Sequence, residues 1–281
     1  MSRFEWLELP DRRPAQAADT AERQAPTDAT SSYRAARRMR ESGYFDAAVP
    51  YYQRAVGFND QDYRAQVELV DTLVRAGRIQ DADAASYAAL NNYRQVRIFY
   101  ASRALALAYR GSYAEAFPLS DISMEGNAPP YARCVRAELL LKSSLDNRST
   151  ALALLNEALS APDSLWESYF VGGLILLNAG CAPYAAGFLA EAVHYNPRAV
   201  AGFLYLGDCF RALRLYEQAL FYYRKAEELE PKHAIALQRQ KECVPSVFGL
   251  MRVFQFGTLR NRWNKEYEKL TQKGPANGID Y

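Results

Sequence analysis

The stretch that decides the fold is Ala201–Pro231, which reads AGFLYLGDCFRALRLYEQALFYYRKAEELEP. Its apolar residues recur three or four positions apart, which is the spacing of one face of an α-helix. They are Phe203, Leu206, Gly207 and Phe210, then Ala219, Tyr223 and Ala226. Pro231 closes the stretch, because proline cannot continue a helix. The stretch therefore predicts two helices joined by a short turn.

The segment directly upstream repeats this arrangement. Its matching residues each lie 34 positions earlier, at Tyr169, Gly172, Gly173, Leu176, Ala185, Leu189, Ala192 and Pro197. A fixed period of this length indicates an array of similar structural units.

A small residue near the start of each second helix marks the units through most of the chain. It recurs with spacings of 34, 34, 35, 34 and 34 residues, at Ala48, Ala82, Ala116, Ala151, Ala185 and Ala219. A second small residue follows in every unit, at Ala55, Ala89, Ser123, Ala158, Ala192 and Ala226. Two coincident series over six units argue against chance. The extra residue of the fourth unit falls near Asp146 and Asn147.

This pattern resembles the tetratricopeptide repeat family, whose units follow W-x₂-L-G-x₂-Y…A-x₃-F…P with a period of 34. The resemblance covers residues 29–231. It implies an all-α, right-handed α-solenoid of about six helix pairs, because one pair cannot cover its own apolar faces. We expect residues 1–28 to be a disordered tail with an apolar docking cluster. Residues 232–270 should form C-terminal capping helices, and residues 271–281 a flexible tail.

The turns and helix ends follow from single residues. Gly43, Gly77, Gly111 and Gly180 lie between the two helices of their units, where a left-handed residue can end the first helix. Pro50 and Pro118 fall just inside second helices, so we expect those helices to start late or to kink. In the fourth unit Glu138 takes a position where a small core residue belongs, which leaves the register of that first helix open.

Composition favours a folded protein without a dominant charge. The formal net charge is +2, which gives no general electrostatic argument for nucleic acid. No stretch approaches the ~18 uncharged apolar residues of a membrane span. The four cysteines are far apart and form no C-x-x-C pair, as is typical of free thiols in a reducing compartment. We therefore expect a cytoplasmic protein.

No residue pattern points to catalysis, a metal or a cofactor. The chain has no Gly-rich phosphate loop of the G-x-x-x-x-G-K-[ST] or G-x-G-x-x-G type. Its two histidines, His194 and His233, flank prolines that end units, where we expect exposed polar residues. The cysteines take small-residue positions, which indicates buried packing. We expect no catalytic, metal-binding or cofactor-binding residues.

The family resemblance implies a concave groove lined by the first helices. Its predicted lining is polar at both ends and apolar in the middle. The residues are Tyr33, Arg37, Arg40, Val67, Asp71, Val74, Ile98, Ala101, Leu105, Ala108, Phe170, Leu174, Leu177, Leu204, Asp208 and Arg211, with Val135 and Leu139 if the fourth register holds. An apolar groove open to water would bind an amphipathic helix or an extended apolar segment. Alternatively, closure of the superhelix covers some of these residues.

The groove differs from the carboxylate clamp of heat-shock co-chaperones in this family. The matching positions hold Tyr33, Arg37, Glu68, Ile98 and Ser102, of which only Arg37 suits a carboxylate. The cluster Arg34, Arg37, Arg38 and Arg40 could meet an acidic peptide or an RNA backbone, or could be a solvated helix face.

Both ends of the chain carry apolar residues beyond the repeats. Near the N-terminus, Phe4, Trp6, Leu7 and Leu9 form a cluster that could dock on a partner, in a groove, or on the outside of its own domain. After Pro245, apolar and basic residues alternate from Phe248 to Tyr267. This segment is expected to cap the solenoid, with docking on anionic lipid as the alternative.

These features predict a non-catalytic adaptor or assembly subunit that binds other proteins in its groove. The alternative is a self-assembling scaffold, a homo-oligomer in which the N-terminal cluster of one copy fills the groove of another.

Overall fold

The computed structural model describes residues 26–159 and 165–243. Within these residues it contains thirteen α-helices and one 3₁₀ helix. The helices are α1 (Ala29–Glu41), α2 (Phe45–Phe58), α3 (Tyr63–Arg75), α4 (Ile79–Asn92), α5 (Ile98–Arg110), α6 (Tyr113–Met124), α7 (Pro130–Ser143), η4 (Leu145–Asn147), α8 (Arg148–Ala158), α9 (Leu165–Asn178), α10 (Ala182–Tyr195), α11 (Val200–Ala212), α12 (Tyr216–Leu229) and α13 (Ala234–Cys243). The predicted all-α solenoid is confirmed.

The helices form six successive pairs, from α1 with α2 to α11 with α12. The six small residues that open the second helices are all 0% exposed, from Ala48 to Ala219. Helix α13 packs on α12 as the first helix of a seventh unit would. The expected capping segment beyond Cys243 lies outside the described residues.

The turns inside the pairs use the left-handed backbone region. Gly43, Gly77, Gly111 and Gly180 have φ between +75° and +88°, as the sequence predicts. In the sixth pair this position is Arg214, a non-glycine residue with φ +61°. That conformation brings Cβ close to the backbone, so Arg214 carries a steric cost that the four glycines avoid.

Two departures from the repeat have a plain structural outcome. The extra residue of the fourth unit is taken up by η4, between α7 and α8. Pro50 and Pro118 lie inside α2 and α6, which begin five residues before them, at Phe45 and Tyr113. The expectation of a late start is therefore wrong. Each proline is the sixth residue of its helix, beyond the first turn, so it removes one i→i−4 backbone hydrogen bond from a helix that nevertheless continues past it.

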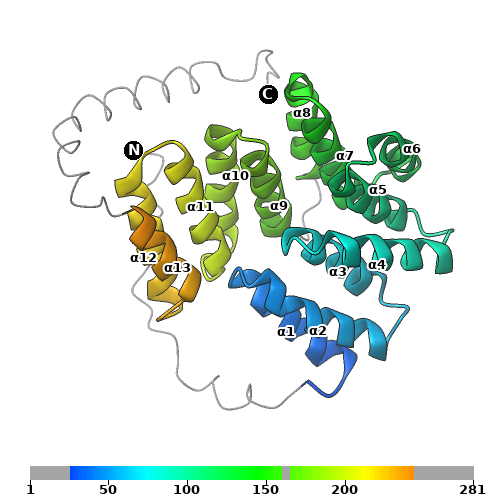
Figure 1. Ribbon diagram of the computed structural model, residues 1–281, viewed down its shortest axis with the longest axis horizontal. Coiled ribbons are helices and arrows are strands. Elements are labelled where there is room, and N and C mark those ends of the chain that lie inside the picture. Colours follow the sequence, from blue (N-terminus) through cyan, green and yellow to red (C-terminus); the bar gives the residue numbers. More distant parts are fainter. Residues whose placement is uncertain (1–25, 160–164, 244–281) are drawn as a thin grey trace, which may run out of the picture.

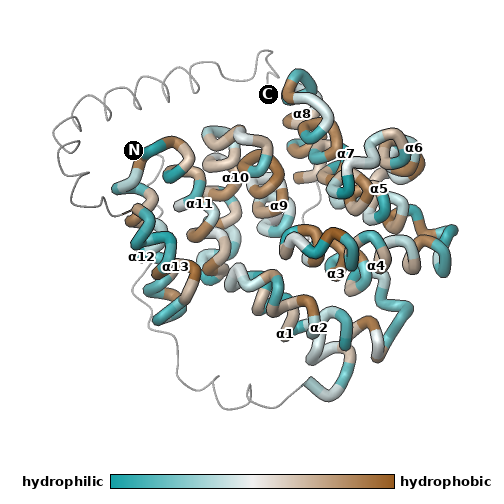
Figure 2. The backbone as a smooth tube through the Cα atoms, in the orientation of Figure 1, coloured by the Kyte–Doolittle hydropathy of each residue, from teal (hydrophilic) through white to brown (hydrophobic). Residues whose placement is uncertain are grey.

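The first helices form the inner layer of the solenoid (Figure 1). Contacts join α3 to α5, α5 to α7, α7 to α9, and α9 to α11, while the second helices make no comparable contacts with one another. We call α1, α3, α5, α7, α9 and α11 the inner helices. Figure 2 shows apolar residues along both α9 and α10, an inner and an outer helix, and a more hydrophilic α12.

Close packing within the pairs depends on glycine. The side chain of Tyr223, on α12, is 0% exposed and lies against Gly207 of α11. A Cβ built on Gly207 would come within 2.5 Å of the Tyr223 ring. Gly173 has the same relation to Leu189 in the fifth pair, also at 2.5 Å. The two helices of each of these pairs can pack this closely only because glycine has no side chain.

The solenoid bends until its first unit meets its sixth and seventh (Figure 1). The His233 ring, just before α13, lies with Nε2 2.7 Å from the carbonyl oxygen of Ser42 and stacks on Tyr44 at 4.4 Å. The ring centroids of Phe45 and of Tyr205 on α11 lie 6.2 Å apart. We call this contact between the α1–α2 turn and α11–α13 the seam. His233 is buried there, so the expectation of an exposed histidine is wrong for it. His194 is exposed.

Candidate functional site

A pocket of about 420 Å³ opens among five successive inner helices, α1 to α9. We call it the inner pocket. Its walls are formed by Arg40, Tyr63, Arg64, Val67, Glu68, Asp71, Ile98, Pro129, Pro130, Tyr131, Cys134, Glu167, Ser168 and Val171. A volume of this size is in the range of sites that hold small ligands or a few side chains of a partner.

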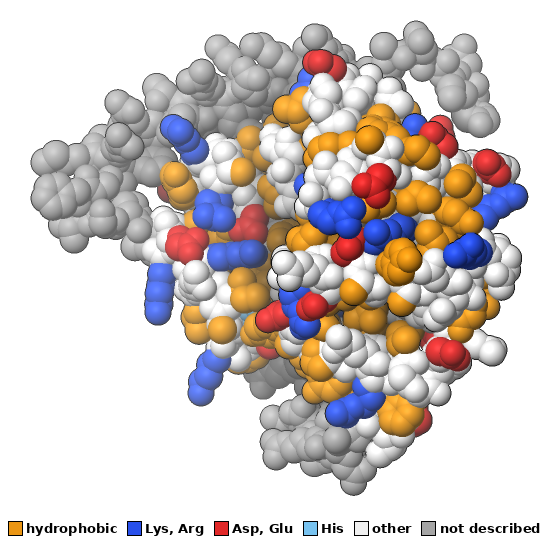
Figure 3. Space-filling view, turned by 45° about the vertical axis from the view of Figure 1, so that its right-hand side comes forward, with side chains coloured by type: hydrophobic (Ala, Val, Ile, Leu, Met, Phe, Trp, Pro, Cys, Tyr) orange, Lys and Arg blue, Asp and Glu red, His pale blue; other side chains and the backbone are white. Residues whose placement is uncertain are grey.

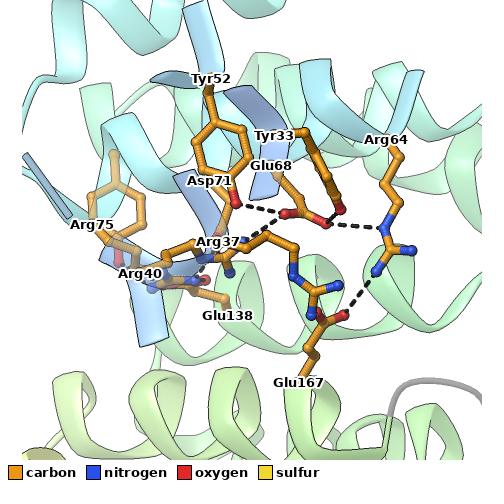
Figure 4. Close-up of polar contacts among 11 residues, drawn as sticks. Tyr33, Arg37, Arg40, Tyr52, Arg64, Glu68, Asp71, Arg75, Glu138 and Glu167 are labelled. Atoms are coloured by element: carbon orange, nitrogen blue, oxygen red, sulfur yellow. Dashed lines mark hydrogen bonds and ion pairs between the residues drawn. The ribbon is translucent and has the colours of Figure 1, made fainter. Parts of the chain in front are cut away.

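One wall is a network of charged and phenolic side chains centred on Glu68 (Figure 4). Glu68 accepts hydrogen bonds from the hydroxyls of Tyr33 and Tyr52, both at 2.6 Å. Arg64 donates to the same carboxylate at 3.1 Å, and Arg40 lies 3.5 Å from it. Three elements, α1, α2 and α3, thus converge on one carboxylate.

The network continues below the pocket towards α7. Asp71 accepts hydrogen bonds from Arg40 at 3.0 Å and from Arg75 at 3.3 Å. Arg75 then binds both oxygens of Glu138, at 2.7 and 2.6 Å. Glu138 is buried, and Tyr109 also donates to it. Glu138 is therefore tolerated in the core because Arg75 neutralises it. Val135 and Leu139 of the same helix are buried too, so neither lines a groove open to water.

These contacts set the protonation of the wall. Burial alone raises the pKa of Glu68, but Arg40 and the two tyrosine hydroxyls outweigh it and leave this pKa below its usual value. For Tyr33 and Tyr52 burial, together with the Glu68 charge, raises the pKa of each phenol. Near neutral pH Glu68 is therefore ionised, and the phenols of Tyr33 and Tyr52 stay protonated.

The opposite wall is apolar. Ile98 and Val171 face the pocket from α5 and α9, and Pro129, Pro130 and Tyr131 come from the start of α7. Cys134 lies one turn further along α7 and is buried. Burial raises the pKa of its thiol to about 12, so this thiol stays protonated and contributes as an apolar group.

Four of the residues predicted to line the groove border the inner pocket: Arg40, Val67, Asp71 and Ile98. Arg37 does not line this pocket, but it forms an ion pair with Glu167, which does. Tyr33 supports the wall through Glu68. Their roles in binding a partner stay predictions.

The expectation of a water-exposed apolar middle is wrong. Ala101, Leu105, Ala108, Phe170 and Leu174 are all buried, as are Val67 and Val74. Phe170 packs on Trp166 and on Tyr205 of α11, at 5.2 and 5.9 Å. The superhelix closes tightly enough for inner helices to pack on one another, which is the alternative that the sequence left open. Leu177 is half-buried.

The sixth unit does not form the open, polar groove end that the sequence predicts. Leu204 is buried at the seam, and Asp208 is buried with Tyr223 at 2.7 Å and Arg239 at 2.8 Å. Burial raises the pKa of Asp208 despite these partners. Arg211 is exposed and pairs with Glu242 at 3.3 Å.

Sequence reasoning missed the part of the inner pocket that α7 and α9 supply. The predicted face of α9 holds Phe170 and Leu174, whereas Glu167, Ser168 and Val171 line the pocket. The true face is turned by about one residue position, roughly 100°. The pair Pro129–Pro130 was a usable signal, because it marks the start of α7 beside the pocket.

Other candidate chemistry is limited in the described residues. The four cysteines are free and buried, as predicted. Across residues 26–159 and 165–243, no group of three His, Cys, Asp or Glu side chains could hold a metal ion. None of the helices described is long and apolar enough to cross a membrane. The docking cluster Phe4, Trp6, Leu7 and Leu9 lies outside the described residues.

Charges of both signs are interspersed on the face drawn in Figure 3, without an extended region of one sign. In α1, Arg37 and Arg40 are engaged with carboxylates of other helices. The arginine cluster is thus used in part to hold the inner layer together.

Residues 205–233 match the family model described as tetratricopeptide repeat. They span the end of α11, the turn and the whole of α12, and five further helix pairs repeat their geometry. This part of the chain is a tetratricopeptide repeat. No curated protein matches its sequence significantly.

Solved structures of other tetratricopeptide repeat proteins are similar to it at low identity. YrrB, described as having an unusual peptide-binding site, is 21% identical with a TM-score of 0.41, over 68% of this chain and 97% of that one. A tetratricopeptide repeat protein of Parabacteroides merdae is 17% identical with a TM-score of 0.47, over 81% and 88%. One of Thermus thermophilus is 18% identical with a TM-score of 0.45, over 76% and 98%.

Proposed function

We propose that this protein is a non-catalytic adaptor or assembly subunit that binds a segment of another protein in the inner pocket. The observation that carries the proposal is the pocket itself, which leaves about 420 Å³ open among the inner helices α1 to α9. Proteins of this family bind other proteins or peptides. The proposal narrows the expected groove to its first five units.

The ligand is an extended segment or one edge of an amphipathic helix. The closed inner layer buries the apolar side chains that a long helix would have needed along α5, α9 and α11. A partner therefore inserts a few side chains instead of lying along the whole superhelix. The expected cytoplasmic location remains part of the proposal, supported by four buried thiols without a disulfide.

The test compares proteins captured by the full chain and by two variants. Val171→Asp places a charge on the half-buried apolar wall, while Tyr87→Asp makes a similar change at an exposed position on the outer helix α4. Partners that bind the inner pocket should be lost with Val171→Asp and retained with Tyr87→Asp. Circular dichroism checks that both variants stay helical. An identical set of partners for all three proteins would contradict the proposal.

The self-assembling alternative makes a different prediction. Light scattering of the full chain and of a chain lacking residues 1–9 would show an oligomer converted to a monomer if the N-terminal cluster fills the pocket of a neighbour. An unchanged mass rules that alternative out and leaves the adaptor proposal standing.

A further inference from the structure

We infer that the inner pocket selects an uncharged apolar side chain, aromatic or branched aliphatic, and rejects carboxylate, phosphate and ammonium groups. This inference rests on the proposed function and names the chemistry that the pocket recognises. It depends on two independent features of the walls, which are the pairing of every carboxylate with guanidinium groups and the proline pair at the start of α7.

The carboxylates of the polar wall have no free capacity directed at a ligand. Both oxygens of Glu68 are engaged, one by Tyr33 and Arg64 and the other by Tyr52 and Arg40. A cation entering the pocket would have to displace one of these partners. The polar wall therefore offers an incoming ammonium group no unpaired carboxylate at Glu68.

Asp71 and Glu167 are paired in the same way. The two oxygens of Asp71 receive Arg75 and Arg40 respectively, at 3.3 and 3.0 Å. Glu167 receives Arg37 at one oxygen, and Arg64 lies 3.5 Å from the other. Each of these two carboxylates thus pairs with one guanidinium group from α1 and one from α3.

Every carboxylate of this network has a guanidinium partner. Glu68, Asp71, Glu138 and Glu167 pair with Arg37, Arg40, Arg64 and Arg75, and a fifth carboxylate, Glu41, lies 3.9 Å from Arg37. The network therefore carries no excess of positive charge. A ligand carboxylate or phosphate would be desolvated without gaining an unpaired cation, and burying a charge without a partner is costly.

The start of α7 removes a second source of polar recognition. A helix N-terminus normally presents backbone N–H groups without helical partners, which attract anions. Here the N-cap and the first helical residue are Pro129 and Pro130, which have no N–H. The N–H groups of Ala132 and Arg133 donate to the carbonyl of Pro129. The start of α7 therefore presents two proline rings to the pocket and keeps a single N–H without a helical partner, that of Tyr131.

Most of what remains at the ligand's side of the pocket is apolar surface, although Tyr131 and Ser168, which carry hydroxyls, also line it. The proline rings lie with Ile98, Val171 and the stem of Tyr131, and burial holds the nearby Cys134 thiol in its neutral form. Removing apolar surface from water contributes about 25 cal/mol per Å². Binding at this wall is therefore driven by burial of an apolar side chain, with the charged network as a rigid support.

The experiment uses the full chain labelled with ¹³C at the δ1 methyl groups of isoleucine. Ile98 lines the inner pocket, whereas Ile79 and Ile122 lie on the outer helices α4 and α6 and serve as internal controls. The probes are the N-acetyl amides of tryptophan, leucine, glutamate and lysine, together with inorganic phosphate. We expect the tryptophan and leucine amides to shift the Ile98 signal, with the charged probes binding at least about tenfold more weakly. Val171→Asp should abolish the Ile98 shift.

Each outcome decides the inference. If the glutamate or lysine amide or phosphate shifts Ile98 as strongly as the tryptophan amide, the selectivity is wrong while the pocket still binds. If no probe shifts Ile98, the inference is overturned, and the partner capture with Val171→Asp decides separately whether the proposed function survives. Equal shifts at Ile79 and Ile122 would show nonspecific contact and would also overturn it.

Discussion

Arg75 of α3 and Glu138 of α7 form a buried two-point ion pair that joins the second repeat to the fourth. Two guanidinium nitrogens lie 2.7 and 2.6 Å from the two carboxylate oxygens. Both side chains are almost fully buried, at 4% and 3% exposure. Arg75 also donates a hydrogen bond to Asp71, which lines the inner pocket. The pair therefore helps to fix the position of the charged wall.

Breaking this pair from one side should strongly destabilise the fold. Arg75→Met leaves the Glu138 charge buried without its partner, and we expect a loss of about 3–5 kcal/mol in unfolding free energy. The double variant Arg75→Met with Glu138→Leu removes both charges and should recover most of that loss. Urea unfolding of the two single variants and the double variant measures the coupling. Additive effects would contradict the pairing.

The contact of Gly207 with Tyr223 predicts a position that does not accept a side chain. Gly207→Ala should lower the unfolding free energy by about 1–3 kcal/mol, because the new Cβ would overlap the phenol ring. Gly187 of α10 is the matched control, since nothing lies within 4 Å of its added Cβ. Gly187→Ala should instead stabilise the protein by about 0.5–1 kcal/mol. Thermal unfolding of both variants compares them, and equal changes would show that helix propensity alone decides.

Arg214 predicts a stabilising substitution. It has φ +61°, at the position where four other turns carry glycine. Arg214→Gly should raise the unfolding free energy by about 1 kcal/mol through removal of the left-handed strain. Its side chain is exposed, so little packing is lost. A lower melting temperature would show that Arg214 makes a contact worth more than the strain.

The seam can be tested with two equivalent glycines. Gly43 and Gly77 both have positive φ, but only an added Cβ at Gly43 meets another helix, at 3.1 Å from Leu204. Gly43→Ala should therefore cost more than Gly77→Ala, which carries the backbone strain alone. Hydrogen exchange of α1 and α2 amides should quicken in Gly43→Ala only. The same rate in both variants would show that the seam is loose in solution.

Glu68 predicts a component of acid sensitivity. Its pKa is lowered from the usual 4.5 of a glutamate, so ionised Glu68 stabilises the fold above that pH. This contribution is lost as the pH falls through the lowered folded-state pKa. In Glu68→Gln the unfolding free energy should be reduced near pH 7, and its difference from the wild type should shrink below about pH 4.5. Urea unfolding at several pH values tests this, and a constant difference would contradict it.

The sequence predicted the repeat well because its signals are local. The series of small residues from Ala48 to Ala219 and the turn glycines report helix pairing inside one unit, and the structure confirms both. The closure of the superhelix could not be predicted in this way. Whether Phe170 faces water or Tyr205 depends on small rotations summed over several units, and no single residue encodes that sum. For the same reason the predicted groove face of α9 differs by about one residue position from the face that borders the inner pocket.

Buried charges were the other source of error. Glu138 looked misplaced in its helix because its partner Arg75 lies 63 positions earlier in the chain. A carboxylate in a core position becomes understandable only once the opposite helix is known.

The seam has a consequence for how the chain acquires its structure. An open array of repeats has contacts between neighbours only, so it can fold from any point and fray from its ends. Here Ser42 meets His233, 191 residues away, and the first unit completes its packing only after the last one exists. Such long-range contacts slow folding, because a large loop must close before they form. In return the first unit and α11–α13 stabilise each other through the seam, so unfolding should begin elsewhere than at the first helix pair.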